Sequence, residues 1–94
     1  MRIGTVEISS KLALAPMAGV TDAAFRQICS ELGAGYTITE LISSKALCYH
    51  DKKTFSLLTQ FSGEHPAAVQ IFGSDPVCMA EAAQIALEAT GADL

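Results

Sequence analysis

The sequence contains no asparagine and only three cysteines among its 94 residues. Without asparagine there is no glycosylation sequon, and Cys29, Cys48 and Cys78 are too widely spaced for a C-x-x-C motif. This odd number of separated cysteines argues against a disulfide framework and against a zinc site, and it fits reduced thiols in the cytoplasm. His50 and His65 have no histidine partner at helical spacing. We therefore expect no metal site.

Long apolar runs are also missing. The longest run, residues 12–20, is interrupted by Pro16 and Gly19, and it is shorter than the ~18 residues of a membrane span. The N-terminal residues lack the apolar core of a signal peptide. Half of the residues are hydrophobic, which excludes intrinsic disorder. We expect a folded cytoplasmic protein with no membrane segment.

Positive charge is scarce, since six lysines and arginines stand against ten aspartates and glutamates. The formal net charge is −4, and the acidic excess lies in residues 51–94. Such a chain does not bind nucleic acid through bulk electrostatics, so any RNA contact must be local.

Strand and helix patterns alternate along the chain. A short polar hairpin is predicted over residues 2–10. The strand predictions that follow are Leu12–Ala15, buried on both faces, then Tyr36–Thr39, then Ala67–Phe72, and the beginning of a fourth strand at Ala92–Leu94.

A helix follows each of the first three strands. The first is predicted to begin with Thr21 as N-cap and to end at Gly33. Its buried stripe is predicted to consist of Phe25, Ile28, Cys29 and Leu32, with Arg26 turned outward.

Two short helices are predicted after the second strand. Ser43 or Ser44 caps the first, and the apolar pattern from Phe55 to Leu58 indicates the second. The last helix is predicted to begin at Asp75–Pro76 and to be capped by Gly91, with Glu81, Gln84 and Glu88 forming its solvent-facing stripe.

This order predicts an α/β fold with a parallel sheet. Strand starts near residues 12, 36, 68 and 92 fit the roughly 31 residues that each unit of a (β/α)8 TIM barrel uses. The chain is therefore interpreted as one incomplete domain over residues 1–94: a hairpin, three βα units and the start of the fourth strand. We expect it to be the N-terminal part of a longer protein, because a parallel strand without a neighbour leaves backbone groups unpaired.

A doubly wound dinucleotide-binding sheet would also give this alternation. Its G-x-G-x-x-G motif should directly follow the first strand. The only G-x-G, at Gly33 and Gly35, precedes a strand, and Ile38 occupies the place of the third glycine. The sequence therefore does not support this fold.

In a barrel, functional sites lie at the carboxyl ends of the strands. Three segments qualify: Pro16–Asp22, Glu40–Ser43 and Gln70–Gly73. The first could let a flat ligand approach the backbone, or it could be a plain turn. Gln70 is polar within an apolar strand and needs a hydrogen-bonding partner, which could be a ligand or neighbouring backbone.

The same segments resemble a known family. Residues 15–22 (APMAGVTD), Phe25–Arg26, residues 31–35 (ELGAG), 39–43 (TELIS) and 69–76 (VQIFGSDP) are similar, in order and spacing, to the N-terminal part of the tRNA-dihydrouridine synthases. The opening Ile3–Gly4 and residues 12–15 (LALA) most resemble the bacterial B-type branch. The motif A-P-M-A alone would also be consistent with other flavin-binding barrels.

The resemblance implies an FMN-dependent (β/α)8 barrel that reduces uridine in tRNA to 5,6-dihydrouridine, with NADPH as the reductant. By position, Pro16, Met17 and Ala18 would line the flavin ring, and Gln70 would hydrogen-bond its polar edge. The family's catalytic cysteine lies in an N-x-G-C-P block after the fourth strand, which the resemblance places beyond Leu94. None of the cysteines present matches it, so we expect no catalytic residue in these 94 residues and no activity from them alone.

Several residues keep two interpretations. Lys45, His50, Lys52 and Lys53 could contact phosphate or form a solvated surface. Glu40 could orient groups of the site, cap a helix or pair with a cation. Asp22 is expected to stabilise the first turn of its helix. Met17 could be core filler, and the three cysteines are expected to be packing residues.

Two other functions stay open at this point. The chain could belong to a different flavin barrel, such as a dihydroorotate dehydrogenase relative. It could also be a small α/β protein without catalysis, for example an interaction module.

Overall fold

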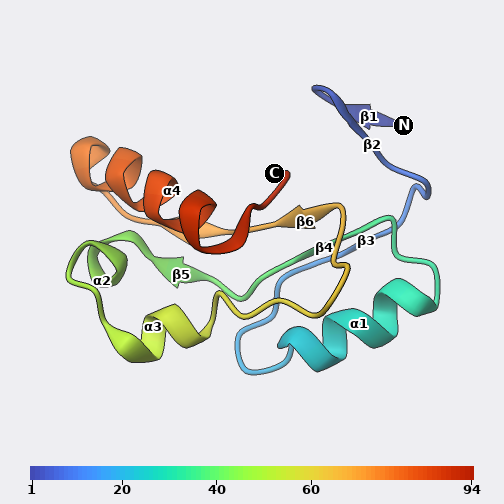
Figure 1. Ribbon diagram of the computed structural model, residues 1–94, viewed down its shortest axis with the longest axis horizontal. Coiled ribbons are helices and arrows are strands. Elements are labelled where there is room, and N and C mark those ends of the chain that lie inside the picture. Colours follow the sequence, from blue (N-terminus) through green and yellow to red (C-terminus); the bar gives the residue numbers. More distant parts are fainter.

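The computed structural model describes all 94 residues and contains seven short strands and four helices (Figure 1). In chain order these are β1 (Arg2–Ile3), β2 (Val6–Glu7), β3 (Ala13–Leu14), α1 (Ala23–Glu31), β4 (Tyr36–Ile38), β5 (Ile42–Ser43), α2 (Ser44–Cys48), α3 (Lys52–Ser56), β6 (Ala67–Ala68), β7 (Ile71–Phe72) and α4 (Pro76–Thr90). None of these helices has the length and apolar character that a membrane crossing requires.

The central sheet is parallel, with strand order β3-β4-β6. Leu14 pairs with Thr37, and Thr37 pairs with Ala67. On the free side of β6, Leu94 donates its N–H to the Ala67 carbonyl at 3.2 Å and accepts from the Val69 N–H at 3.1 Å. The predicted parallel α/β organisation is confirmed, and β1 and β2 form the predicted antiparallel hairpin.

The predicted strand Ala67–Phe72 is interrupted. β6 pairs with β4 at an offset of 30 residues, whereas β7 pairs with β5 at an offset of 29. Three residues (39–41) therefore lie opposite two (69–70), which is the geometry of a β-bulge. The side chain of Thr39 covers the gap, because its hydroxyl accepts the Gln70 N–H at 3.2 Å.

The prediction that Leu12–Ala15 is a strand buried on both faces was wrong. The strand is shorter, and the Leu12 side chain is 69% exposed. The reason is that β3 packs closely only with its neighbour β4, and no helix covers its outer face.

Helix α1 corrects two predictions. Its N-cap is Asp22 rather than Thr21, and the Asp22 carboxylate accepts the Phe25 N–H at 2.9 Å. Its predicted buried stripe is largely exposed, with Ile28 at 55% and Leu32 at 83%, whereas Arg26, predicted to face outward, is 1% exposed. Arg26 turns inward because a buried carboxylate and backbone carbonyls satisfy its guanidinium.

The ends of α2 and α4 follow the predictions. Ser43 caps α2, and Asp75 caps α4 with proline at its first position. The third helix, α3, begins earlier than the predicted stretch from Phe55 to Leu58, because the Asp51 carboxylate accepts the Thr54 N–H and caps it, and Leu57 and Leu58 lie beyond its last residue. Gly91 ends α4 at a φ of +66°, and the stripe of Glu81, Gln84 and Glu88 is exposed.

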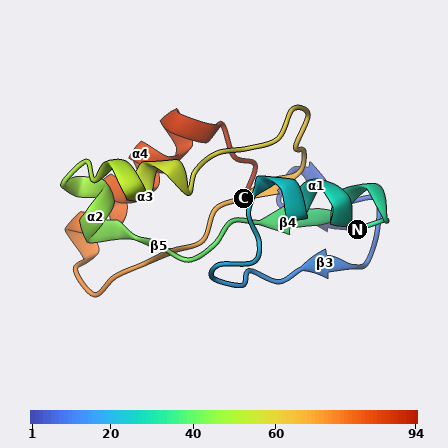
Figure 2. The ribbon, with the colours of Figure 1, turned by 90° about the horizontal axis from the view of Figure 1, so that it is seen from below.

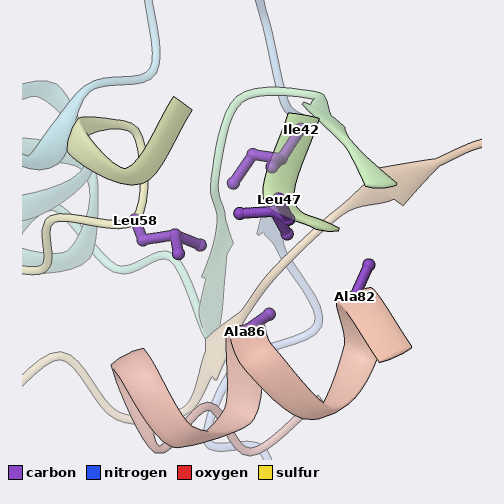
Figure 3. Close-up of a cluster of buried hydrophobic side chains, with 5 residues drawn as sticks. All are labelled: Ile42, Leu47, Leu58, Ala82 and Ala86. Atoms are coloured by element: carbon purple, nitrogen blue, oxygen red, sulfur yellow. The ribbon is translucent and has the colours of Figure 1, made fainter. Parts of the chain in front are cut away.

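The apolar core lies among α2, α3, α4 and β5, where five buried side chains point toward one another: Ile42, Leu47, Leu58, Ala82 and Ala86 (Figure 3). Figure 2 shows that these three helices gather at one end of the molecule, while α1, β3 and β4 lie at the other. The two alanines let α4 approach α2 closely.

Candidate functional site

The three segments expected to carry function leave the same edge of the sheet. They follow the carboxyl ends of β3, β4 and β6, which are parallel neighbours in that order. The paired register ends at Leu14, Ile38 and Ala68, so Met17, Glu40 and Gln70 each lie within three residues of the end of one of three neighbouring strands. In a barrel, residues that directly follow the carboxyl ends of the strands are the ones that contact a ligand.

The loop after β3 is held in shape by Thr21, which is fully buried. The Thr21 hydroxyl accepts the Met17 N–H at 3.0 Å and lies 3.2 Å from the Met17 carbonyl, to which it donates. The same carbonyl accepts the N–H groups of Val20 and Thr21, each at 3.0 Å. Thr21 therefore closes this loop instead of capping the helix.

Glu40 connects this loop to the next strand. Its carboxylate accepts the Gly19 N–H at 2.5 Å, across 21 residues of sequence. Gly19 adopts a φ of +75°, a conformation that glycine reaches without the strain of a Cβ. Of the roles open for Glu40, this contact favours orientation of the loop.

These bonds leave one free donor near the tip of the loop. Pro16 has no N–H, the Met17 N–H is bound by Thr21 and the Gly19 N–H by Glu40. The Ala18 N–H makes no hydrogen bond within the chain, and Ala18 is exposed. Met17 is 42% exposed, so it is not core filler in this structure.

Gln70 lies in the bulge between β6 and β7, and not inside a strand as predicted. Its backbone is fully used, because its N–H donates to Thr39 and its carbonyl accepts the Ile42 N–H at 2.9 Å. Its side chain is exposed, and its amide has no hydrogen-bonding partner in the chain. The fixed backbone presents a free amide at the same edge as the loop after β3.

A buried ion pair supports the loop from below. The Arg26 guanidinium donates to the Thr21 carbonyl at 2.8 Å and to the carboxylate of Glu64 at 2.7 Å. The sequence did not reveal that Thr21 closes the loop, because Thr21 and Asp22 are adjacent and either can cap a helix. It also did not reveal that Arg26 is buried. No local pattern links Arg26 to a glutamate 38 residues away.

Pro16, Met17, Ala18 and Gln70 do not line either of two pockets, of about 230 and about 820 Å³. A pocket of about 230 Å³ lies beside Asp22, Arg26, Glu40 and Leu57. The larger one, of about 820 Å³, lies between α2 and α4 at the carboxyl ends of β5 and β7. Its lining includes Lys45, Cys48, Phe72, Cys78 and Glu81.

The remaining candidates lie on helices or beside them. Lys45, Lys52 and Lys53 are exposed on α2 and α3, and His50 stacks on Phe55 with ring centroids 5.9 Å apart. Cys29, Cys48 and Cys78 are free and half-buried. No group of three or more histidine, cysteine or acidic side chains is placed to hold a metal ion.

Comparison with known proteins agrees with the motifs along these segments. Residues 13–94 match the model of the family described as dihydrouridine synthase (Dus). Relatives named tRNA-dihydrouridine synthase B are 44% identical in Pseudomonas aeruginosa over 89% of this chain, and 44% identical in Pasteurella multocida over 94%. The Escherichia coli relative of the same name is 42% identical over 94% of this chain. The chain spans about a quarter of the length of these relatives: 25%, 26% and 27% respectively.

Proposed function

This chain belongs to the dihydrouridine synthase family, and we propose that it contributes a flavin-binding edge to an enzyme that reduces uridine in tRNA to 5,6-dihydrouridine with NADPH. When bound, FMN would supply the hydride-transfer chemistry of this reaction. The protein's part is to bind and orient the cofactor and the base, and to exclude competing reactions.

Two unpaired polar groups support a flat, hydrogen-bonding ligand at this edge. The Ala18 N–H and the Gln70 side-chain amide have no partner within the chain, and both follow strands whose carboxyl ends share one edge. We propose that Pro16, Met17 and Ala18 line the flavin ring and that Gln70 donates to its polar edge. Met17 offers an exposed, polarisable side chain, which suits contact with a ring.

The observation that carries this assignment is the hydrogen bond from Gly19 to Glu40. It holds the loop after β3 against the end of β4, one strand away from Gln70. Preorganised groups of this kind reduce the cost of binding, because the loop loses little freedom when a ligand arrives.

The strand order supports a (β/α)8 TIM barrel containing residues 1–94. β3, β4 and β6 lie side by side in the same order as they occur along the chain, and Leu94 pairs on the outer side of β6. A doubly wound sheet instead reverses its direction of growth at a switch point. The sheet therefore grows in one direction, as a barrel does.

No residue of this chain is proposed as the catalytic acid. Cys29, Cys48 and Cys78 lie on α1, α2 and α4, and none follows the end of a central strand. For tRNA, we propose that Lys45, Lys52 and Lys53 contact phosphate groups, because they are exposed cations in an otherwise acidic chain.

The test measures FMN affinity and dihydrouridine formation in the complete enzyme that contains residues 1–94, and in its Gln70→Ala variant. The variant should bind FMN about tenfold more weakly, since a lost hydrogen bond of about 1.4 kcal/mol gives that factor. Gln84→Ala is the matched control, because Gln84 is exposed on α4 and bonds only to Glu88. A complete enzyme that takes up no FMN and forms no dihydrouridine with NADPH and unmodified tRNA would refute the proposed function.

A further inference from the structure

Two cysteines that the proposed reaction does not use lie in contact. Cys48 is the last residue of α2, and Cys78 lies in the first turn of α4. Their sulfur atoms are 3.0 Å apart, and the Cys48 sulfur lies 3.5 Å from the Cys78 carbonyl oxygen. A disulfide bond is about 2.05 Å long, so the two sulfurs need to approach by only about 1 Å to become bonded.

The two helices hold this pair in position. α2 and α4 pack through the core of Ile42, Leu47, Ala82 and Ala86 (Figure 3), and Cys48 packs against this core. Cross-linking therefore requires no large movement of either helix. Because the packed helices keep Cys48 and Cys78 in contact, each should bond to the other rather than form a mixed disulfide with another thiol.

A small oxidant can reach both sulfurs. Cys48 and Cys78 line the pocket of about 820 Å³ between α2 and α4, and both side chains are half-buried rather than enclosed. Cys29 has the same degree of burial, but it lies on α1 and makes no contact with another cysteine. The chain thus contains its own control for chemistry that depends on the pair.

The two thiols are coupled to each other. The hydrogen bond with Cys78 raises the pKa of Cys48 to about 12, together with desolvation and the nearby carboxylate of Glu81. The separation of 3.0 Å between the sulfurs places either one to complete a bond that the other begins.

We propose that Cys48 and Cys78 form a redox-responsive dithiol that hydrogen peroxide closes into a disulfide joining α2 to α4. The thiolate of one cysteine of the pair attacks one peroxide oxygen, the O–O bond breaks, and hydroxide leaves as water after it takes up a proton. That cysteine is then a sulfenic acid. The sulfur of the other cysteine attacks it, the S–O bond breaks, and the hydroxyl group leaves with the proton of the second thiol as a second water. Two thiols lose two electrons, and one peroxide becomes two waters.

The experiment treats the purified, reduced protein with hydrogen peroxide, blocks the remaining thiols and digests it with trypsin without reduction. Cleavage after Lys45, Lys52 and Lys53 places Cys48 in peptide 46–52 and Cys78 in a peptide that begins at Thr54. Mass spectrometry should find these two peptides joined, and the number of titratable thiols should fall by two. Dithiothreitol should restore both.

Three variants test the pairing. Cys29→Ser should leave the cross-link intact, because Cys29 lies outside the pair. Cys48→Ser and Cys78→Ser should each abolish the cross-link and leave the remaining cysteine of the pair as a sulfenic acid that dimedone traps. Recovery of Cys48 and Cys78 as separate oxidised or unmodified thiols from the peroxide-treated wild-type protein would overturn the proposal, as would equal cross-linking to Cys29.

Discussion

Arg26 on α1 and Glu64 in the loop before β6 form an ion pair that is almost completely buried. Their side chains are 1% and 3% exposed, and the guanidinium contacts both carboxylate oxygens, at 2.7 and 3.2 Å. The Thr37 hydroxyl donates to the same carboxylate at 2.7 Å, and Arg26 also donates to the carbonyls of Thr21 and Thr59. One satisfied network thus joins α1, β4 and two loops.

Removal of one charge from this network should destabilise the protein. In Glu64→Gln the guanidinium stays buried without a counter-charge, and we expect the free energy of unfolding to fall by about 3–5 kcal/mol. Chemical denaturation measures the difference. Glu7→Gln is the control, because Glu7 pairs with Arg2 at 3.0 Å while both side chains are 69% exposed. That change should cost less than about 1 kcal/mol, and equal losses in the two variants would contradict the assignment.

The same network explains where sequence reasoning failed on α1. Periodicity placed Phe25, Ile28 and Leu32 inward and Arg26 outward, since a charge normally faces solvent. The inward position of Arg26 depends on Glu64, which lies 38 residues later and carries no local signal. Periodicity describes one helix at a time, so it cannot show that a buried cation has a distant partner.

Local signals were reliable where the chemistry itself is local. The cap at Asp75, the proline that follows it and the glycine that ends α4 satisfy backbone groups within one turn, and the structure shows all three as predicted. The break at Val69–Gln70 was missed because it arises from a change of register between two strands. The contact of Glu40 with Gly19 likewise joins separate elements, so the sequence could name the segments of the site but not their connections.

Thr21 should act as a positioning residue for the loop after β3. Thr21→Val keeps the shape of the side chain but removes the hydroxyl that binds the Met17 N–H and carbonyl. We expect a loss of about 1 kcal/mol in stability and weaker FMN binding, because the partly buried Met17 N–H loses its partner. Thr21→Ser keeps the hydroxyl and should restore FMN affinity. If Val and Ser variants bind FMN equally, the hydroxyl has no role in positioning.

The Glu40 carboxylate should contribute to FMN affinity without contacting the cofactor. Glu40→Ala frees the Gly19 N–H and one end of the loop, and hydrogen bonds to charged groups contribute about 1.5–3 kcal/mol. We expect FMN binding to weaken by about tenfold or more in a fluorescence titration. Glu40→Gln keeps an acceptor oxygen, so its FMN affinity should fall less. Glu88→Ala, on the exposed face of α4, should bind FMN with unchanged affinity. An unchanged affinity in Glu40→Ala would contradict the role of this bond.

The Asp93 carboxylate should make the stability of the protein depend on pH. The Ala67 N–H donates to its carboxylate at 2.9 Å and lowers its pKa below the usual 3.8, and His65, also at 2.9 Å, adds to the effect. The folded state thus holds the carboxylate charged more strongly than the unfolded state does. This contribution is complete above the unfolded pKa of about 3.9 and is lost as the pH falls through the folded value.

Asp93→Asn should therefore be less stable than the wild type at pH 6, and the difference should shrink as the pH falls below about 4. Urea denaturation at a series of pH values measures it. His65→Ala separates the two causes: because the Ala67 N–H is the larger one, most of the pH dependence should survive in that variant. If wild type and Asp93→Asn instead lose stability in parallel from pH 6 to pH 2, the charge on Asp93 does not hold the chain end against β6.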